Sequence, residues 1–174
     1  NREKFKSENG LLDLMREEVW DANIYDIIHC QIGQLEMALT HTDHYGEEYF
    51  IFVNGHHTND GGTHLSSFRE GVLKGVNQFF NTSFDAPDIR DGIVGAIAIK
   101  VQDPVFESQT KNKLGNSDLR SWLMPLVRDT LIDFFLEFSN ILHLFLNKFW
   151  FKEAHTTIPL RIFLNLITSI WRKE

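Results

Sequence analysis

Cysteine, basic charge and long apolar runs are all scarce in this sequence. Cys30 is the only cysteine among 174 residues, so no disulfide can form within the chain and a reducing compartment is expected. No Lys or Arg occurs between Arg16 and Arg69, although that stretch carries many acidic side chains. So acidic a surface repels phosphate at long range, which argues against a nonspecific nucleic-acid binder and leaves any phosphate contact to a few placed cations.

Membrane-spanning and secreted classes are also disfavoured. The Phe-rich stretch 132–151 is interrupted by Asp133, Glu137, His143 and Lys148, whereas a membrane span needs about 20 nearly uncharged residues. The first residues show no charged segment followed by an apolar one, so we expect a cytoplasmic protein and no membrane partner. With 43% hydrophobic residues, the chain can bury the core of one ordinary domain.

Hydrophobic periodicity predicts a mixed α and β fold. Apolar residues at helical spacing predict a short helix over 11–19, a helix over 63–80, and a long helix that begins near Ser117 or Asp118 and extends through Phe138. β-branched and aromatic runs predict four strands, at 25–30, 35–41, 49–53 and 93–101. The last strand is apolar on both faces, so we expect it in the centre of the sheet.

The segment 141–174 is rich in Phe, Leu and Ile and lacks the amphipathic face of a helix packed on its own domain. Two interpretations stay open. The segment buries against a neighbouring domain, or it is a divergent or frame-disrupted terminus. No function is assigned to it.

The polar loop 106–115 contains the first candidate site. In an extended loop, residues i and i+2 point the same way, so Gln109 and Lys111 would project together. An ammonium group beside an amide suits a terminal phosphate, because the lysine supplies charge and the glutamine a directional hydrogen bond. The alternative is a solvated polar loop without function.

A second candidate consists of His56, His57 and His64 with Asp60, which lie within nine positions. The spacing matches no strong zinc pattern, and adjacent histidines in a strand point to opposite faces. We therefore predict no metal site, and whether the histidines bind anything stays open.

The third candidate is the pair Gly61-Gly62, which precedes a helix that Thr63 is expected to cap. Glycines at a helix N-terminus can receive phosphate, but the full nucleotide-binding fingerprints are absent. A tight turn into the helix explains the pair equally well.

Three segments, taken in order, resemble a known family. They are residues 52–64, with Phe-Val-Asn-Gly and Gly-Gly-Thr-His, followed by Phe68-Arg69; residues 88–101, with Asp-Ile-Arg-Asp-Gly-Ile; and residues 104–115, with Gln-Thr-Lys at 109–111. Together they resemble the transducer domain of the ATPase (B) subunit of bacterial type IIA topoisomerases. The resemblance covers about residues 8–140. Residues 27–29 and 45–49 are more similar to topoisomerase IV than to gyrase, but the sequence does not decide between the two.

The resemblance implies an α+β fold, with a mixed four-stranded sheet, helices on one face and the left-handed βαβ crossover of ribosomal-protein-like and GHMP kinase folds. It divides the chain into a linker and short helix (1–20), the transducer domain (21–140) and the apolar tail (141–174). A GHKL ATPase domain would precede residue 1, and a TOPRIM domain would follow the tail.

The resemblance also assigns roles to residues. Gln109 and Lys111 would contact the γ-phosphate of ATP held by the GHKL domain, and Lys111 would act catalytically by stabilising the charge that develops during hydrolysis. ATP and Mg would be bound mainly outside this chain. The implied partners are the two flanking domains, a second copy of the ATPase subunit, the DNA-cleaving A subunit, and DNA through the whole complex.

We therefore expect that the chain alone neither hydrolyses ATP nor passes DNA strands. Two other functions remain possible from sequence. One is the middle domain of another GHKL ATPase, such as a MutL-like protein. The other is a catalytically inert interaction remnant held by its apolar tail.

Overall fold

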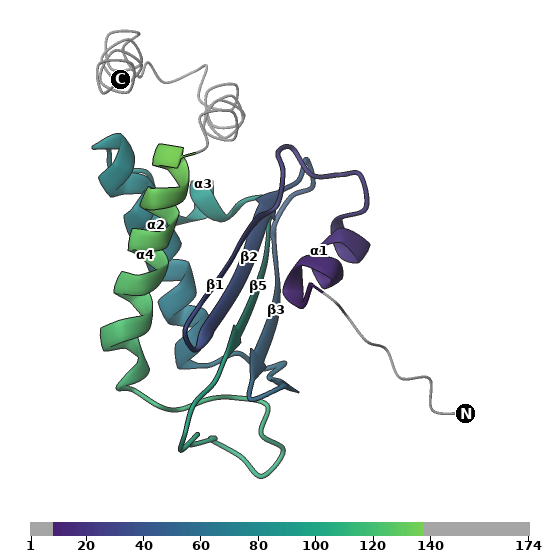
Figure 1. The fold of residues 1–174 in the computed structure, drawn as a ribbon, viewed down its shortest axis with the longest axis vertical. Coiled ribbons are helices and arrows are strands. Elements are labelled where there is room, and N and C mark those ends of the chain that lie inside the picture. Colours follow the sequence, from purple (N-terminus) through teal and green to yellow (C-terminus); the bar gives the residue numbers. More distant parts are fainter. Residues whose placement is uncertain (1–8, 138–174) are drawn as a thin grey trace, which may run out of the picture.

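The structure, a computed structural model, describes residues 9–137, which form one mixed β-sheet with helices on both faces (Figure 1). The strands follow the order β1-β2-β5-β3-β4 across the sheet. Strand β5 lies antiparallel to β2 and parallel to β3. The strands are β1 (Ile28–Ile32), β2 (Leu35–His41), β3 (Glu47–Val53), β4 (His56–His57) and β5 (Ile93–Ile99). The helices are α1 (Leu11–Val19), α2 (Thr63–Phe80), α3 (Ala86–Arg90) and α4 (Leu119–Glu137).

Strand β5 requires cover on both faces of the sheet, because nearly all of its residues are buried. Helices α2 and α4 lie side by side on one face, and α1 lies on the opposite face (Figure 1). The larger core fills the space between the sheet and the α2–α4 pair, with Phe68 and Val76 of α2 and Leu123 and Leu131 of α4 buried in it. The central strand is therefore enclosed, as its sequence predicts.

Helix α1 covers the second face with a narrow apolar stripe. Leu11, Met15 and Val19 are spaced four residues apart and are all buried. The Glu36 carboxylate of β2 accepts a hydrogen bond from the Leu11 backbone N–H, with an N···O distance of 2.7 Å. An anion at this end also complements the helix dipole, so the sheet fixes where α1 begins. The helix rests on three small or β-branched residues of the sheet, Ala38, Val94 and Ala96.

Most predicted elements are confirmed. The helices over 11–19 and 63–80 and the strand over 35–41 have the predicted bounds, and the sheet is mixed. The prediction of four strands is wrong, because His56 and His57 form a fifth, two-residue strand after the Asn54-Gly55 turn. So short a polar strand carries no apolar pattern that a sequence could reveal. The prediction of helices on one face is also wrong, since α1 covers the other.

The first strand begins three residues later than predicted, at Ile28. Tyr25 is buried before the strand, and its hydroxyl is hydrogen-bonded to Nδ1 of His41. The other ring nitrogen, Nε2 of His41, lies 2.7 Å from the Ile89 carbonyl oxygen and donates to it, so one buried histidine links β2 to α3. Tyr25 therefore packs in the core and binds His41, and it takes no part in the pairing of β1 with β2.

None of the helices within residues 9–137 is both long and apolar enough to cross a membrane. The apolar segment 141–174 lies outside the described residues, as does Phe138, the last residue predicted for the final helix.

Candidate functional site

The loop between β5 and α4 has an ordered base. The Gly115 N–H donates to the Val105 carbonyl at 2.8 Å, and the Glu107 N–H donates to the Lys113 carbonyl at 3.0 Å. These bonds pair the two arms of the loop in antiparallel fashion. The Asn116 side chain adds a further link, because its Oδ1 accepts from the Val105 N–H at 2.6 Å. The loop is therefore a hairpin-like projection with a fixed base.

The tip of this loop is a tight turn, not the extended segment on which the pairing of Gln109 with Lys111 was predicted. The Lys111 N–H donates to the Ser108 carbonyl at 3.1 Å, which closes a four-residue turn. Lys111 has a φ of +56°, in the left-handed region that costs an L-residue about 1–2 kcal/mol. Gln109 and Lys111 are both exposed at this tip. Both residues belong to this one four-residue turn, which replaces the alternation expected of an extended strand.

The two lysines of the loop differ in their partners. Lys113 Nζ lies 2.9 Å from a carboxylate oxygen of Glu107 on the opposite arm, so its charge is locally neutralised. Among the residues that the structure describes, the Lys111 side chain has neither an ion pair nor a hydrogen bond. The tip thus carries an uncompensated ammonium group and an exposed amide within one turn, donors of the kind suited to an anion.

The glycine pair before α2 contacts this same loop. The Thr63 N–H donates to the Leu114 carbonyl at 3.0 Å, and the Thr63 hydroxyl lies 3.3 Å from the same oxygen. The hydroxyl therefore binds the loop and does not cap the helix as predicted; the residue before the helix is Gly62. In return, the Leu114 N–H donates to the Gly61 carbonyl at 3.2 Å. The first N–H of α2 is thus occupied by protein backbone, which favours the tight-turn interpretation of the glycines over the phosphate site.

The three histidines do not converge on one point. His56 and His57 are exposed on β4, where the His57 ring stacks on Phe52 with centroids 5.0 Å apart. His64 is buried in the first turn of α2, and its Nε2 donates to the Thr58 hydroxyl at 2.9 Å. Within residues 9–137, no group of three or more His, Cys, Asp or Glu side chains could hold a metal ion.

Burial lowers the pKa of His64 to about 4, because the charged imidazolium would lose its hydration. The Thr58 hydroxyl already donates to the Ile51 carbonyl at 3.2 Å, so its oxygen accepts the hydrogen bond from the Nε2–H of His64. In the described part of the chain, His64 Nδ1 has no hydrogen-bond partner. His64 is therefore a neutral structural histidine that joins the start of α2 to β3.

The structure also contains an ionic cluster that the sequence did not reveal. Glu47 lies 2.9 Å from the Arg69 guanidinium and 3.7 Å from that of Arg90. The Arg69 guanidinium also lies over the Tyr49 ring, 4.6 Å from its centroid. Burial is the main cause that raises the pKa of Tyr49. The cluster joins residues that are distant in sequence. In the sequence, only Arg69, the first Lys or Arg after Arg16, pointed to an ion pair here.

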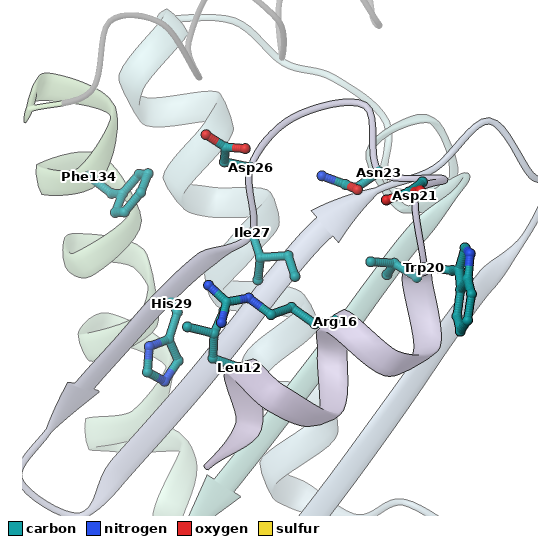
Figure 2. A pocket seen from close by; sticks show the side chains of 10 residues that line it. Leu12, Arg16, Trp20, Asp21, Asn23, Asp26, Ile27, His29 and Phe134 are labelled. Atoms are coloured by element: carbon teal, nitrogen blue, oxygen red, sulfur yellow. The ribbon is translucent and has the colours of Figure 1, made fainter. Parts of the chain in front are cut away.

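A separate hollow of about 920 Å³ opens between α1 and the segment that leads into β1 (Figure 2). Arg16, Asp26 and His29 contribute polar groups to its wall, and Phe134 of α4 lies at its edge. Neither Gln109 nor Lys111 lines it. The hollow and the loop tip are therefore distinct features of the described residues.

The DNA gyrase B family model matches residues 6–157 of the chain. The sequence is 50% identical over 121 residues to the B subunit of DNA topoisomerase 4 from Borreliella burgdorferi, a match that covers 69% of this chain and 20% of that relative. It is 35% identical over 122 residues to the B subunit of DNA gyrase from the same organism, covering 65% of this chain and 18% of the relative. The chain thus spans about a fifth of the length of these relatives.

Solved structures of similar fold come from the same group. The 43K ATPase domain of Thermus thermophilus gyrase B, in complex with an aminocoumarin, superposes with a TM-score of 0.69 at 22% identity, over 83% of this chain and 43% of that one. A topoisomerase IV ATP-binding domain of Francisella tularensis, in complex with a small-molecule inhibitor, gives a TM-score of 0.61 at 20% identity, over 83% of this chain and 42% of that one. At these identities the likeness concerns the fold.

Proposed function

The chain belongs to the DNA gyrase B family of type IIA topoisomerase ATPase subunits, and from this premise we propose that it is the transducer domain of such a subunit. In this role the domain senses the γ-phosphate of ATP bound to a preceding GHKL domain. It then couples hydrolysis to movement of a DNA gate. The family match supports this assignment over a MutL-like protein or an inert remnant.

One observation carries the proposal: the exposed turn that presents Gln109 and Lys111 on a fixed base. Left-handed backbone at residues other than glycine collects at functional sites, where surrounding structure maintains it. Lys111 has this conformation, and its ammonium group has no counter-ion among the described residues. An unpaired cation on a strongly acidic chain is suited to an anion supplied from outside the domain.

The donors at the tip fit the terminal phosphate of ATP. Lys111 supplies a positive charge that would become more stabilising as negative charge develops during hydrolysis, and the Gln109 amide supplies a directional hydrogen bond. A magnesium ion does not fit the described residues, since no cluster of three or more suitable ligands occurs among them. The Mg ligands would then lie in the GHKL domain, as the family resemblance implies.

Loss of the γ-phosphate would remove the partner of Lys111 and favour a second orientation of the domain. In the whole enzyme this rotation would act on a following TOPRIM domain, a second copy of the ATPase subunit and the DNA-cleaving A subunit. The parallel β3–β5 pair, joined through α2, is the βαβ unit for which the family resemblance implies a left-handed crossover. The higher identity with a topoisomerase 4 relative than with a gyrase relative of one organism supports a topoisomerase IV role.

The test is ATP hydrolysis by the full-length subunit with Lys111→Ala, and with Lys113→Ala as the matched control. Both variants remove one lysine charge from the same loop. Because Lys111 would face the reacting phosphate, its loss should lower the turnover number by about 10²-fold. Lys113 is paired with Glu107, so its loss should change turnover less than about threefold, as exposed ion pairs contribute little.

The isolated chain should show no turnover at all, since most of the nucleotide site would lie outside it. Equal losses for the two lysine variants, or hydrolysis by the isolated chain that Lys111→Ala abolishes, would contradict the proposal.

A further inference from the structure

We infer that Gly62 is a positioning residue, which fixes the Gln109–Lys111 tip by allowing the loop backbone to seat directly on the start of α2. This inference rests on the proposed function and deepens it. It assigns to the Gly61-Gly62-Thr63 turn a role in holding the sensor rather than in binding phosphate.

The contact between the turn and the loop is formed by backbone on both sides. Gly62 pairs with Leu114 as an isolated parallel bridge, and the Asp60 N–H donates to the Asn112 carbonyl at 3.0 Å. Thr63 and Gly61 add their backbone hydrogen bonds to Leu114. The second arm of the loop, residues 112–115, thus lies between the first arm and the turn before α2. Asn112 directly follows Lys111, so the contact reaches the base of the tip itself.

Only glycine permits this approach. A Cβ atom at position 62 would lie 2.4 Å from the Leu114 carbonyl oxygen and 2.5 Å from its nitrogen, distances that no side-chain rotation can relieve because both atoms belong to backbone. Gly62 also has a φ of +135°, which residues other than glycine rarely adopt. Any side chain there would separate the loop from the helix.

The turn and the buried Leu114 are both held in the core, so a shift between them would be taken up by the exposed tip of the loop. The Thr58 N–H donates to the Ile51 carbonyl of β3 at 2.9 Å, and His64 Nε2 donates to the Thr58 hydroxyl. Both Thr58 and His64 are buried. The start of α2 is thereby attached to the sheet, whereas the tip of the loop is exposed. A Cβ atom at position 62 would therefore displace Lys111.

The experiment measures ATP hydrolysis by the full-length subunit carrying Gly62→Ala. A displacement of about 1 Å at a catalytic group can cost up to about 10²-fold in rate, so turnover should fall at least tenfold. The affinity for ADP, which lacks the γ-phosphate, should stay within twofold of wild type. Gly55→Ala is the matched control, because Gly55 also has a positive φ, +81°, but no atom within 4 Å of the added Cβ. It should retain turnover within about twofold.

Because Gly62→Ala could misfold, a pair of milder variants at Thr63 tests the same contact. Thr63→Val removes the hydroxyl that contacts the Leu114 carbonyl and should lower turnover about threefold, whereas Thr63→Ser keeps the hydroxyl and should restore it. If the turn before α2 only supported folding, turnover would not depend on whether residue 63 carries a hydroxyl. Equal turnover of the Val and Ser variants, together with an unaffected Gly62→Ala enzyme, would overturn the inference.

Combining Gly62→Ala with Lys111→Ala separates this inference from the proposed function. If Gly62 acts through Lys111, the double variant should be no slower than Lys111→Ala alone. If the two losses multiply instead, Gly62 acts elsewhere and the inference fails while the proposed function stands. If Lys111→Ala alone leaves turnover unchanged, the proposed function fails first.

Discussion

Lys111 and Lys113 show how two identical side chains in one loop can differ in what they are able to do. Lys113 pairs with Glu107 across the base, whereas Lys111 stands at the strained tip without a counter-ion among the described residues. The sequence identified both as loop lysines, and the family motif distinguished them. Spacing alone could not, because the expected alternation of an extended loop is replaced by a turn.

His64 is a second residue whose sequence context is misleading, since it belongs to a histidine-rich segment but is buried and neutral. Its pKa is about 4 when folded and about 6.5 when unfolded, so the unfolded chain binds the proton more tightly. The contribution of neutral His64 to the free energy of unfolding is therefore fully present above pH 6.5 and is lost as the pH drops toward 4. Between pH 7 and pH 5 the expected loss from this group is about 2 kcal/mol.

The measurement is the free energy of unfolding of the chain in urea at pH 7 and pH 5, for wild type and for His64→Gln. Glutamine cannot titrate but retains an N–H donor that can reach the Thr58 hydroxyl. The variant should lack the additional loss of about 2 kcal/mol between the two pH values. Parallel pH dependence in the two proteins would show that His64 titrates normally.

At the scale of elements, helix periodicity was the most reliable signal. The apolar residues of the stretch 63–80 recur at helical spacing and predict the bounds of α2 correctly, because one apolar face of the helix meets one core. The two-residue strand β4 and the position of α1 on the second face could not be obtained in the same way. Strand β4 consists of two polar residues paired with the neighbouring end of β3, and α1 rests on β2 and β5, which are distant from it in sequence. The base of the 104–116 loop also depends on residues distant in sequence, since its partners include the turn before α2.

The close packing of α2 on α4 depends on a glycine inside the helix. A Cβ atom at Gly71 would lie 2.7 Å from Val127 Cβ and 2.9 Å from the Met124 carbonyl oxygen, so the helices would have to separate. Gly71→Ala should therefore destabilise the chain by about 1–3 kcal/mol, although alanine is the better helix former.

Gly75→Ala is the control for that prediction, because it lies one turn further along α2 and its nearest contact would be 3.2 Å. The gain in helix propensity is the same at both positions. Urea unfolding of the chain should show a clearly smaller loss at position 75. Equal stabilities of the two variants would mean that the helices do not pack as closely as described.

At the scale of the whole molecule, the proposed function depends on one cation acting outside its own domain. The chain carries a formal net charge of −7, which disfavours a broad phosphate-binding surface. Enclosed on both faces, the sheet supplies a stable base, and the loop extends beyond it. A domain built in this way is suited to report on a ligand bound by its neighbour.

The most direct measurement is the rate at which an amine-acylating reagent modifies Lys111 in the full-length subunit, followed by mass spectrometry of the peptides. The comparison is between no nucleotide, ADP, and an ATP analogue whose γ-phosphate cannot be cleaved. Lys113, whose partner Glu107 lies within the chain, is the internal reference. We predict that the analogue slows modification of Lys111 at least about tenfold, that ADP does not, and that Lys113 reacts equally in all three. A Lys111 that reacts at the same rate in every state would contradict the proposed role.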